Sequence, residues 1–251
     1  MRMNDIDTLK NSALELMKIN GYAIKEKVIV EVDERLPIMG YTTERNGMTL
    51  IVVSKWAVTS GGVTGLIIHE MSHVYRTESN HPSHNFSLHN RILNNVLMGR
   101  KMKSFQIEIL RNTINNLQDL YADDISFSVY FRNEKKTISE FFLGWVHEPI
   151  IPARTSEDIW SNAGDLLNAA FAEANIKRHN AIDKDKKIER AVKDLLRKSD
   201  KKVASKYKYF KDVMVNMPEE ISDKDFEVLL TKYINEFLEL TDFTPHDRVA
   251  N

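Results

Sequence analysis

Gly-Leu-Ile-Ile-His-Glu-Met-Ser-His-Val, residues 65–74, is the most informative stretch of this chain, because it contains the pattern His-Glu-x-x-His. Residues four apart lie on one face of a helix, so His69 and His73 are expected to direct two imidazoles at one point. Glu70 follows His69 by about 100° around the helix and can reach a water held there. Two imidazoles and a third ligand leave zinc one open position for such a water. The motif therefore predicts a catalytic Zn²⁺ site with Glu70 as its general base.

The surroundings of the motif favour a buried helix that follows a strand. Apolar residues lie on both sides of the two histidines, and polar groups in such a setting need partners, which a metal would supply. Gly61 and Gly62 provide a flexible entry to a helix that is expected to run to about Thr77. The β-branched run Met48–Ser54 just before it predicts a strand.

Composition limits the classes of protein that fit. The chain has 251 residues, of which 42% are hydrophobic and 28% charged, and its net charge of −1 gives no bulk electrostatic case for a nucleic-acid or membrane partner. It contains no cysteine, which excludes disulfides and cysteine-ligated zinc. No apolar run reaches the roughly 18 residues of a membrane span, and the polar start does not resemble a signal peptide. These features predict a soluble, cytoplasmic protein.

The pattern of elements predicts an α+β fold that is predominantly helical, with a small sheet. We expect a core that carries the His-Glu-x-x-His motif over residues 1–150 and a helical region over residues 151–251, packed on the core or appended to it. The Lys-rich stretch 184–211 has acidic residues interleaved, which is typical of a solvated helix face. Residues 35–47 contain three turn-forming residues and predict a loop or an irregular hairpin. Further helices are expected over residues 5–19, 86–98, 105–131, 156–174 and 226–240, and a further strand over residues 27–32.

The third metal ligand has several candidates. Asp119 and Asp123 are four apart on a predicted long helix and share a face away from its apolar stripe. One of them could bind the metal while the other accepts the second ring N–H of a ligating histidine, and we assign Asp119 to the metal and Asp123 to the outer role. His84, in the cluster His-Pro-Ser-His of residues 81–84, is the alternative ligand, as is Asp123 itself. The spacing leaves the choice open.

Taken together, these residues resemble the zincin metallopeptidases, and most closely the gluzincin branch that includes thermolysin. In that branch a first helix carries His-Glu-x-x-His and a later helix carries Glu-x-x-x-Asp, often with Ala before the Asp. The run from Asp119 to Asp123 matches the Ala-Asp end of that second motif, in the right order, with Asp119 where the family has glutamate. The resemblance covers about residues 48–130 and implies that Met48–Ser54 is an edge strand lining a cleft. SprT-like proteases are a weaker likeness, because the aromatic residue after His84 is displaced to Phe86.

The resemblance implies a zinc-dependent peptidase that acts on peptide or protein substrates. In such an enzyme, zinc activates a water and Glu70 takes its proton as the water attacks the peptide carbonyl. A non-catalytic zincin-fold protein that binds metal or a partner is the alternative from another class. The sequence does not indicate a substrate preference or an oligomeric state.

Overall fold

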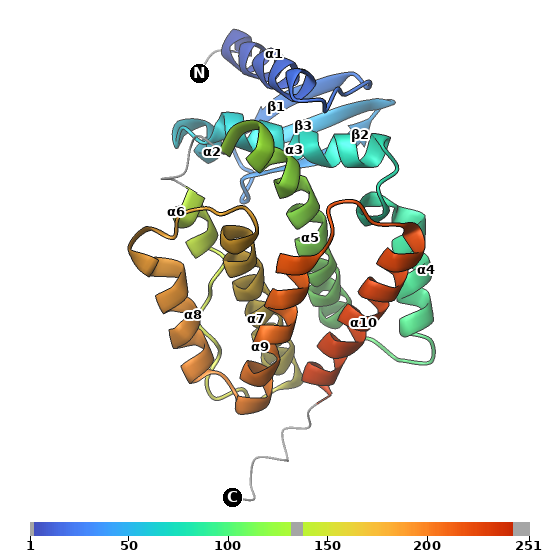
Figure 1. Cartoon of the computed structure of the whole chain (residues 1–251), viewed down its shortest axis with the longest axis vertical. Helices are drawn as coiled ribbons and strands as arrows, with labels where there is room; N and C mark the ends of the chain where they lie inside the picture. Colours follow the sequence, from blue (N-terminus) through green and yellow to red (C-terminus); the bar gives the residue numbers. More distant parts are fainter. Residues whose placement is uncertain (1–2, 132–137, 243–251) are drawn as a thin grey trace, which may run out of the picture. The chain divides into compact units, whose positions relative to one another are not determined.

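The computed structural model describes residues 3–131 and 138–242, which are predominantly helical with one three-stranded sheet (Figure 1). The predicted α+β class is confirmed at this level. No helix in these two ranges is long and apolar enough to cross a membrane. The strands are β1 (Val28–Asp33), β2 (Gly40–Arg45) and β3 (Met48–Ser54). The helices are α1 (Met3–Ile19), α2 (Lys55–Thr59), α3 (Val63–Glu78), η1 (Pro82–His84), α4 (Phe86–Val96), α5 (Ser104–Ser126), η2 (Phe127–Phe131), α6 (Ile138–Leu143), α7 (Ser156–Arg178), η3 (Lys184–Lys186), α8 (Lys187–Lys198), α9 (Lys201–Asn216) and α10 (Asp223–Thr241).

The chain forms two compact units, and neither is continuous in sequence. The first unit comprises residues 1–84 and 121–134, and the second comprises residues 85–120 and 135–251. The boundary expected near residue 150 assumed that each domain is one continuous segment of the chain. In the structure, α5 begins in the second unit and passes into the first between Leu120 and Tyr121.

The sheet of the first unit has the order β1-β3-β2, with β1 parallel and β2 antiparallel to β3. Strand β3 is therefore central, and the expectation that Met48–Ser54 forms an edge is wrong. The physical reason is visible in its burial, because every residue after Met48 is buried on one face or the other. Strands β1 and β2 take the two outer positions, and β2 is the more polar of them, as expected for a strand at the edge of a sheet.

A tight turn joins β2 to β3. Arg45 pairs with Met48, so only Asn46 and Gly47 lie between the strands, and both have positive φ angles, 56° and 70°. Asn-Gly is the preferred pair for such a two-residue hairpin, because both residues tolerate left-handed backbone. Residues 35–47, expected to be a loop or an irregular hairpin, thus contain a regular edge strand.

Helices α1 and α3 pack with the sheet around one apolar core (Figure 1). The amphipathic pattern of α1 directs Ala13 and Met17 inward, and neither is exposed. Ile67, Ile68 and Met71 of α3 are likewise fully buried in the same core. This apolar face holds α3 against the sheet and leaves its other face for the two histidines.

Gly40 at the start of β2 is expected to be intolerant of a side chain. A Cβ there would lie 2.8 Å from the backbone oxygen of Val52 and 3.2 Å from Cδ2 of Leu66 on α3. Gly40→Ala should lower the free energy of unfolding by about 1–3 kcal/mol, the usual cost of overpacking, in a denaturant titration. Gly62→Ala is the matched control, because its Cβ would meet only Ser60 Oγ at 3.8 Å. Equal stability of the Gly40 variant and the wild-type protein would contradict this packing.

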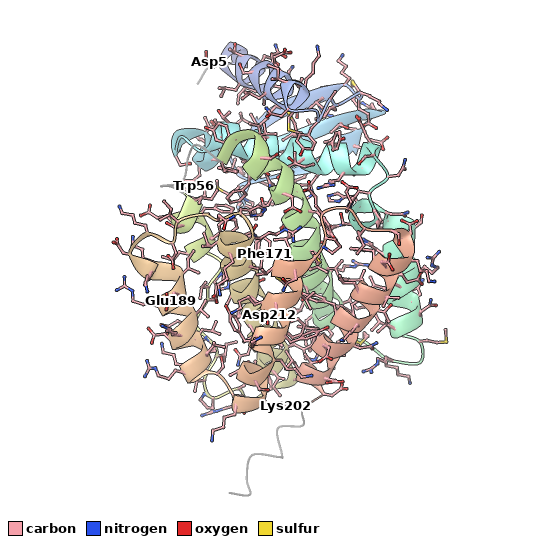
Figure 2. All side chains as sticks on the ribbon, in the orientation of Figure 1. Asp5, Trp56, Phe171, Glu189, Lys202 and Asp212 are labelled. Carbon is pink, nitrogen blue, oxygen red and sulfur yellow. The ribbon has the colours of Figure 1, made fainter. Side chains whose placement is uncertain are left out.

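The second unit is a helical assembly around α7. Thr155 and Asp158 form a capping box at its start, which satisfies backbone N–H groups of the first turn. Small residues along α7 permit close packing with α9, and Phe171 is only 1% exposed. Figure 2 shows Phe171 amid these helices and Lys202 at their surface. The predicted helix over residues 156–174 is correct in its start and four residues short at its end.

Candidate metal centre

Helix α3 presents the two motif histidines on the face opposite its buried one. The apolar residues that flank them in sequence are buried, whereas His69 and His73 are partly exposed. The side chain of His69 is 21% exposed. The helical spacing anticipated from the sequence is therefore present, and both imidazoles are partly exposed.

The Nε2 atoms of His69 and His73 face each other at 3.1 Å. The two rings are nearly perpendicular, with an interplanar angle of 81° and centroids 4.8 Å apart. Tetrahedral ligands at the usual zinc–nitrogen distance lie about 3.3 Å apart. The separation of these two nitrogens is thus close to that of two ligands on one metal ion.

The Nδ1 atoms of both histidines point away from this position and are held by other side chains. His69 Nδ1 lies 2.9 Å from Oδ1 of Asp123, which is 5% exposed. His73 Nδ1 lies 2.8 Å from Nε2 of His84. A hydrogen bond to the second ring nitrogen is the usual way in which proteins orient a metal-ligating histidine.

Asp119 completes a group of three residues whose ligand atoms lie within 4.8 Å of one another, together with His69 and His73. Among the described residues, it is the single group of three or more His, Cys, Asp or Glu side chains whose ligand atoms are close enough to hold one metal ion. Asp119 lies one turn before Asp123 on α5, which is continuous from Ser104 to Ser126, so the helix itself places both carboxylates. All three ligand candidates are partly exposed.

Glu70 is 6% exposed, and its carboxylate accepts a hydrogen bond of 2.7 Å from the hydroxyl of Thr42 on β2. Thr42 is not predictable from a loop or an irregular hairpin, which is the structure expected for residues 35–47. The Asn46-Gly47 pair directly before the predicted strand Met48–Ser54 was the signal that could have identified it, because Asn-Gly is typical of a two-residue hairpin. Thr42 therefore links the edge strand to the acidic residue of the motif.

Arg76, one turn after His73, is a second residue that the sequence analysis missed. It is only 3% exposed, and its Nε donates to the backbone oxygen of Tyr121 on α5 at 3.2 Å. Its guanidinium also lies over the Tyr121 ring, 5.9 Å from the centroid. Together with the bond from His69 to Asp123, this contact sets the position of α3 against the last turns of α5.

The remaining histidines near the motif in sequence have other surroundings. Both ring nitrogens of His84 lie within hydrogen-bonding distance of protein atoms, Nε2 with His73 and Nδ1 with Ser83 Oγ at 2.8 Å. His89 belongs to the second unit, where its ring stacks on Phe226 at 5.5 Å. The geometry thus places His84 behind His73, and the choice of Asp119 as third ligand stays a prediction.

The donor set fits zinc by its chemistry and spacing. Two imidazole nitrogens and one carboxylate are a usual set of protein ligands for a catalytic zinc ion. Both histidines have their second nitrogen engaged by a buried or half-buried polar group, which leaves Nε2 to face the proposed metal position. The site is therefore a His₂-carboxylate cluster in a predominantly helical α+β protein.

Over residues 9–239, the chain matches the family described as "Family of unknown function (DUF5781)", and it belongs to that family. Comparison of this chain with the curated proteins and with the solved structures found no match.

Proposed function

We propose that this protein is a zinc-dependent peptidase of the zincin type. The observation that carries the proposal is the convergence of His69 Nε2 and His73 Nε2 at 3.1 Å, with Asp119 completing the ligand group. Zinc bound there would supply a Lewis acid that lowers the pKa of a water toward about 7 and polarises a carbonyl. The side chains and the sheet edge of this protein would bind and orient the peptide, and Glu70 would transfer the protons.

The order of the motifs supports the zincin assignment. His-Glu-x-x-His lies on α3, and Asp119 and Asp123 lie on the later helix α5. In the gluzincins the second motif provides both a ligand and a carboxylate that orients a histidine. The 2.9 Å approach of Asp123 to His69 Nδ1 corresponds to the second of these roles. Aspartate at position 119 is one methylene shorter than the family glutamate, so α5 would approach the metal more closely.

Glu70 is the general base in this proposal. It would take a proton from the attacking water and pass it to the leaving amine of the cleaved peptide. Thr42 holds one carboxylate oxygen, which limits the rotation of the Glu70 side chain and orients the other oxygen. Such positioning is how proton transfer groups reach their productive geometry.

An extended peptide is the substrate form that the sheet would accept. Among the strands of the described residues, β2 pairs with β3 alone, so its other edge has backbone groups to which an added strand could bind. Helix α3 packs against β2, and Thr42 of this strand reaches Glu70. A peptide paired along β2 would therefore run past the general base. This role falls to β2 because β3 is paired on both sides.

A non-catalytic metal-binding protein is the second candidate function. Its support is the burial of Glu70 and its hydrogen bond to Thr42, which a purely structural carboxylate would also show. The two candidates share the metal site and differ in whether a peptide bond is broken.

The test combines metal analysis with a cleavage assay on the purified full-length protein. We expect about one equivalent of zinc per chain and cleavage of peptides in a random library, with both lost after chelation and restored by added zinc. Zinc without cleavage would establish the non-catalytic alternative. Protein that neither retains nor takes up zinc would overturn the proposal.

Thr42→Val is expected to slow hydrolysis without releasing zinc. The substitution keeps the β-branched shape and removes the hydroxyl that donates to Glu70. A hydrogen bond of this type contributes about 1–1.5 kcal/mol, so kcat/KM should fall by about tenfold. Steady-state kinetics would measure it, with Thr43→Val on the same strand as control, since Thr43 is exposed. An unchanged kcat/KM would remove Thr42 from the site.

A further inference from the structure

The segment from His81 to His84 forms a continuous polar chain that ends on a motif histidine. His81 Nδ1 lies 2.7 Å from Ser83 Oγ, Ser83 Oγ lies 2.8 Å from His84 Nδ1, and His84 Nε2 lies 2.8 Å from His73 Nδ1. Ser83 is fully buried and His81 is 5% exposed. This row of hydrogen bonds leads from η1 to α3, and these two elements pack against each other within the first unit.

The hydrogen bonds along this chain run in one direction. The backbone N–H of Ser83 donates to His81 Nδ1 at 3.3 Å, so that nitrogen carries a lone pair and also accepts from the Ser83 hydroxyl. With its own proton directed at His81, Ser83 Oγ accepts from His84 Nδ1–H. A neutral imidazole has one N–H and one lone pair, so His84 Nε2 accepts from His73 Nδ1–H.

This direction leaves a lone pair on His73 Nε2. As a neutral imidazole, His69 takes the same tautomer, because its Nδ1 faces the acceptor oxygen of Asp123 and the lone pair is then on Nε2. Two lone pairs then face each other at 3.1 Å, which repels unless a cation lies near both. The backbone N–H of Ser83 donates the first of the four hydrogen bonds that lead to His73, and their direction gives His73 the tautomer that a metal requires.

We propose that His84 is a positioning residue for the metal centre, and that the relay of His81, Ser83 and His84 holds His73 as an Nε2 ligand. This inference rests on the proposed metal site and does not depend on peptide hydrolysis. It assigns His84 a role different from that of third ligand: it acts on the metal through His73. Asp123 does the same for His69, so each motif histidine has its own orienting partner.

Two amide substitutions of His84 separate this role from a structural one. His84→Gln places an amide oxygen near the position of Nε2 and keeps an acceptor for His73 Nδ1–H. His84→Asn is shorter, reaches only the position of Nδ1, and keeps the contact with Ser83 while losing the one with His73. The two variants have similar polarity and should fold alike, which thermal unfolding of the metal-free proteins would check.

The measurements are zinc affinity by chelator competition and the visible spectrum of the Co²⁺-loaded protein. We expect His84→Asn to bind zinc about 10–100-fold more weakly and to show an altered Co²⁺ spectrum, the usual effect of losing an outer partner. His84→Gln should stay close to the wild-type protein in both. If both variants bind zinc as the wild-type protein does, or weaken equally, the positioning role is wrong while the metal site stands. A wild-type protein that binds zinc but cleaves no peptide overturns only the peptidase proposal, and one that binds no zinc overturns both.

Discussion

Glu70→Gln is expected to remove peptide hydrolysis while zinc stays bound. Glutamine has the same shape and can still accept the hydrogen bond from Thr42, but it cannot take a proton from water. General-base catalysis contributes about 10²–10⁴-fold, so kcat should fall by at least about 100-fold. Because the proposed ligands are His69, His73 and Asp119, the zinc content should not change.

The measurement is kcat with a cleaved peptide, together with zinc analysis of the same preparation. Glu15→Gln is the matched control, since it makes the same change of charge at an exposed position of α1 in the same unit. Retained turnover in the Glu70 variant would remove it from the role of base. Loss of zinc from that variant would instead indicate that Glu70 supports the metal site.

His73→Ala is expected to have the largest effect on metal binding. It removes one of two converging imidazoles and also leaves Nε2 of His84 without the group that it contacts at 2.8 Å. Loss of an outer partner already weakens metal affinity by about 10–100-fold, so loss of a direct ligand should exceed that range. The purified variant should then contain almost no zinc.

Chelator competition and metal analysis would measure this effect, with His147→Ala as control. His147 is a histidine of the second unit whose side chain is 55% exposed and contacts Asp165. The same titration with Asp119→Ala tests the third ligand, and we expect a loss comparable to that of His73→Ala. An intact affinity in the Asp119 variant would move the third ligand elsewhere, and an intact affinity in the His73 variant would exclude the site.

Hydrophobic periodicity predicted the elements with a strong apolar pattern well, and it did not give bounds for α2, α6, α8 or α9. The strand Met48–Ser54 has the expected bounds, and the long helices α5 and α7 begin within a residue of their predicted starts. These segments have strong apolar patterns, whose burial decides the conformation locally. The edge strand β2 could not be recognised in this way, since an edge strand needs few apolar residues. Whether such a segment forms a strand depends on the neighbouring strand with which it pairs.

The arrangement of the strands and the roles of His84 and Thr42 could not be predicted in the same way. Three strands can be ordered in more than one way with the same alternation of residues, and nothing in Met48–Ser54 itself states that both its edges are paired. Likewise, a histidine eleven residues after His73 has the spacing of either a ligand or an orienting partner. The distinction depends on a difference of a few ångströms in three dimensions.

The sequence by itself determined that this protein is mainly helical with a small sheet, and that two imidazoles and a carboxylic acid share one turn of α3. Both follow from interactions between residues close in the chain, namely the burial of an apolar face and the 3.6-residue period of a helix. Only the tertiary structure decided that β2 is the edge strand next to Glu70, that Asp123 and His84 hold the two histidines, and that Asp119 joins them. These contacts join residues from 11 to 54 positions apart, and packing of whole elements brings them together.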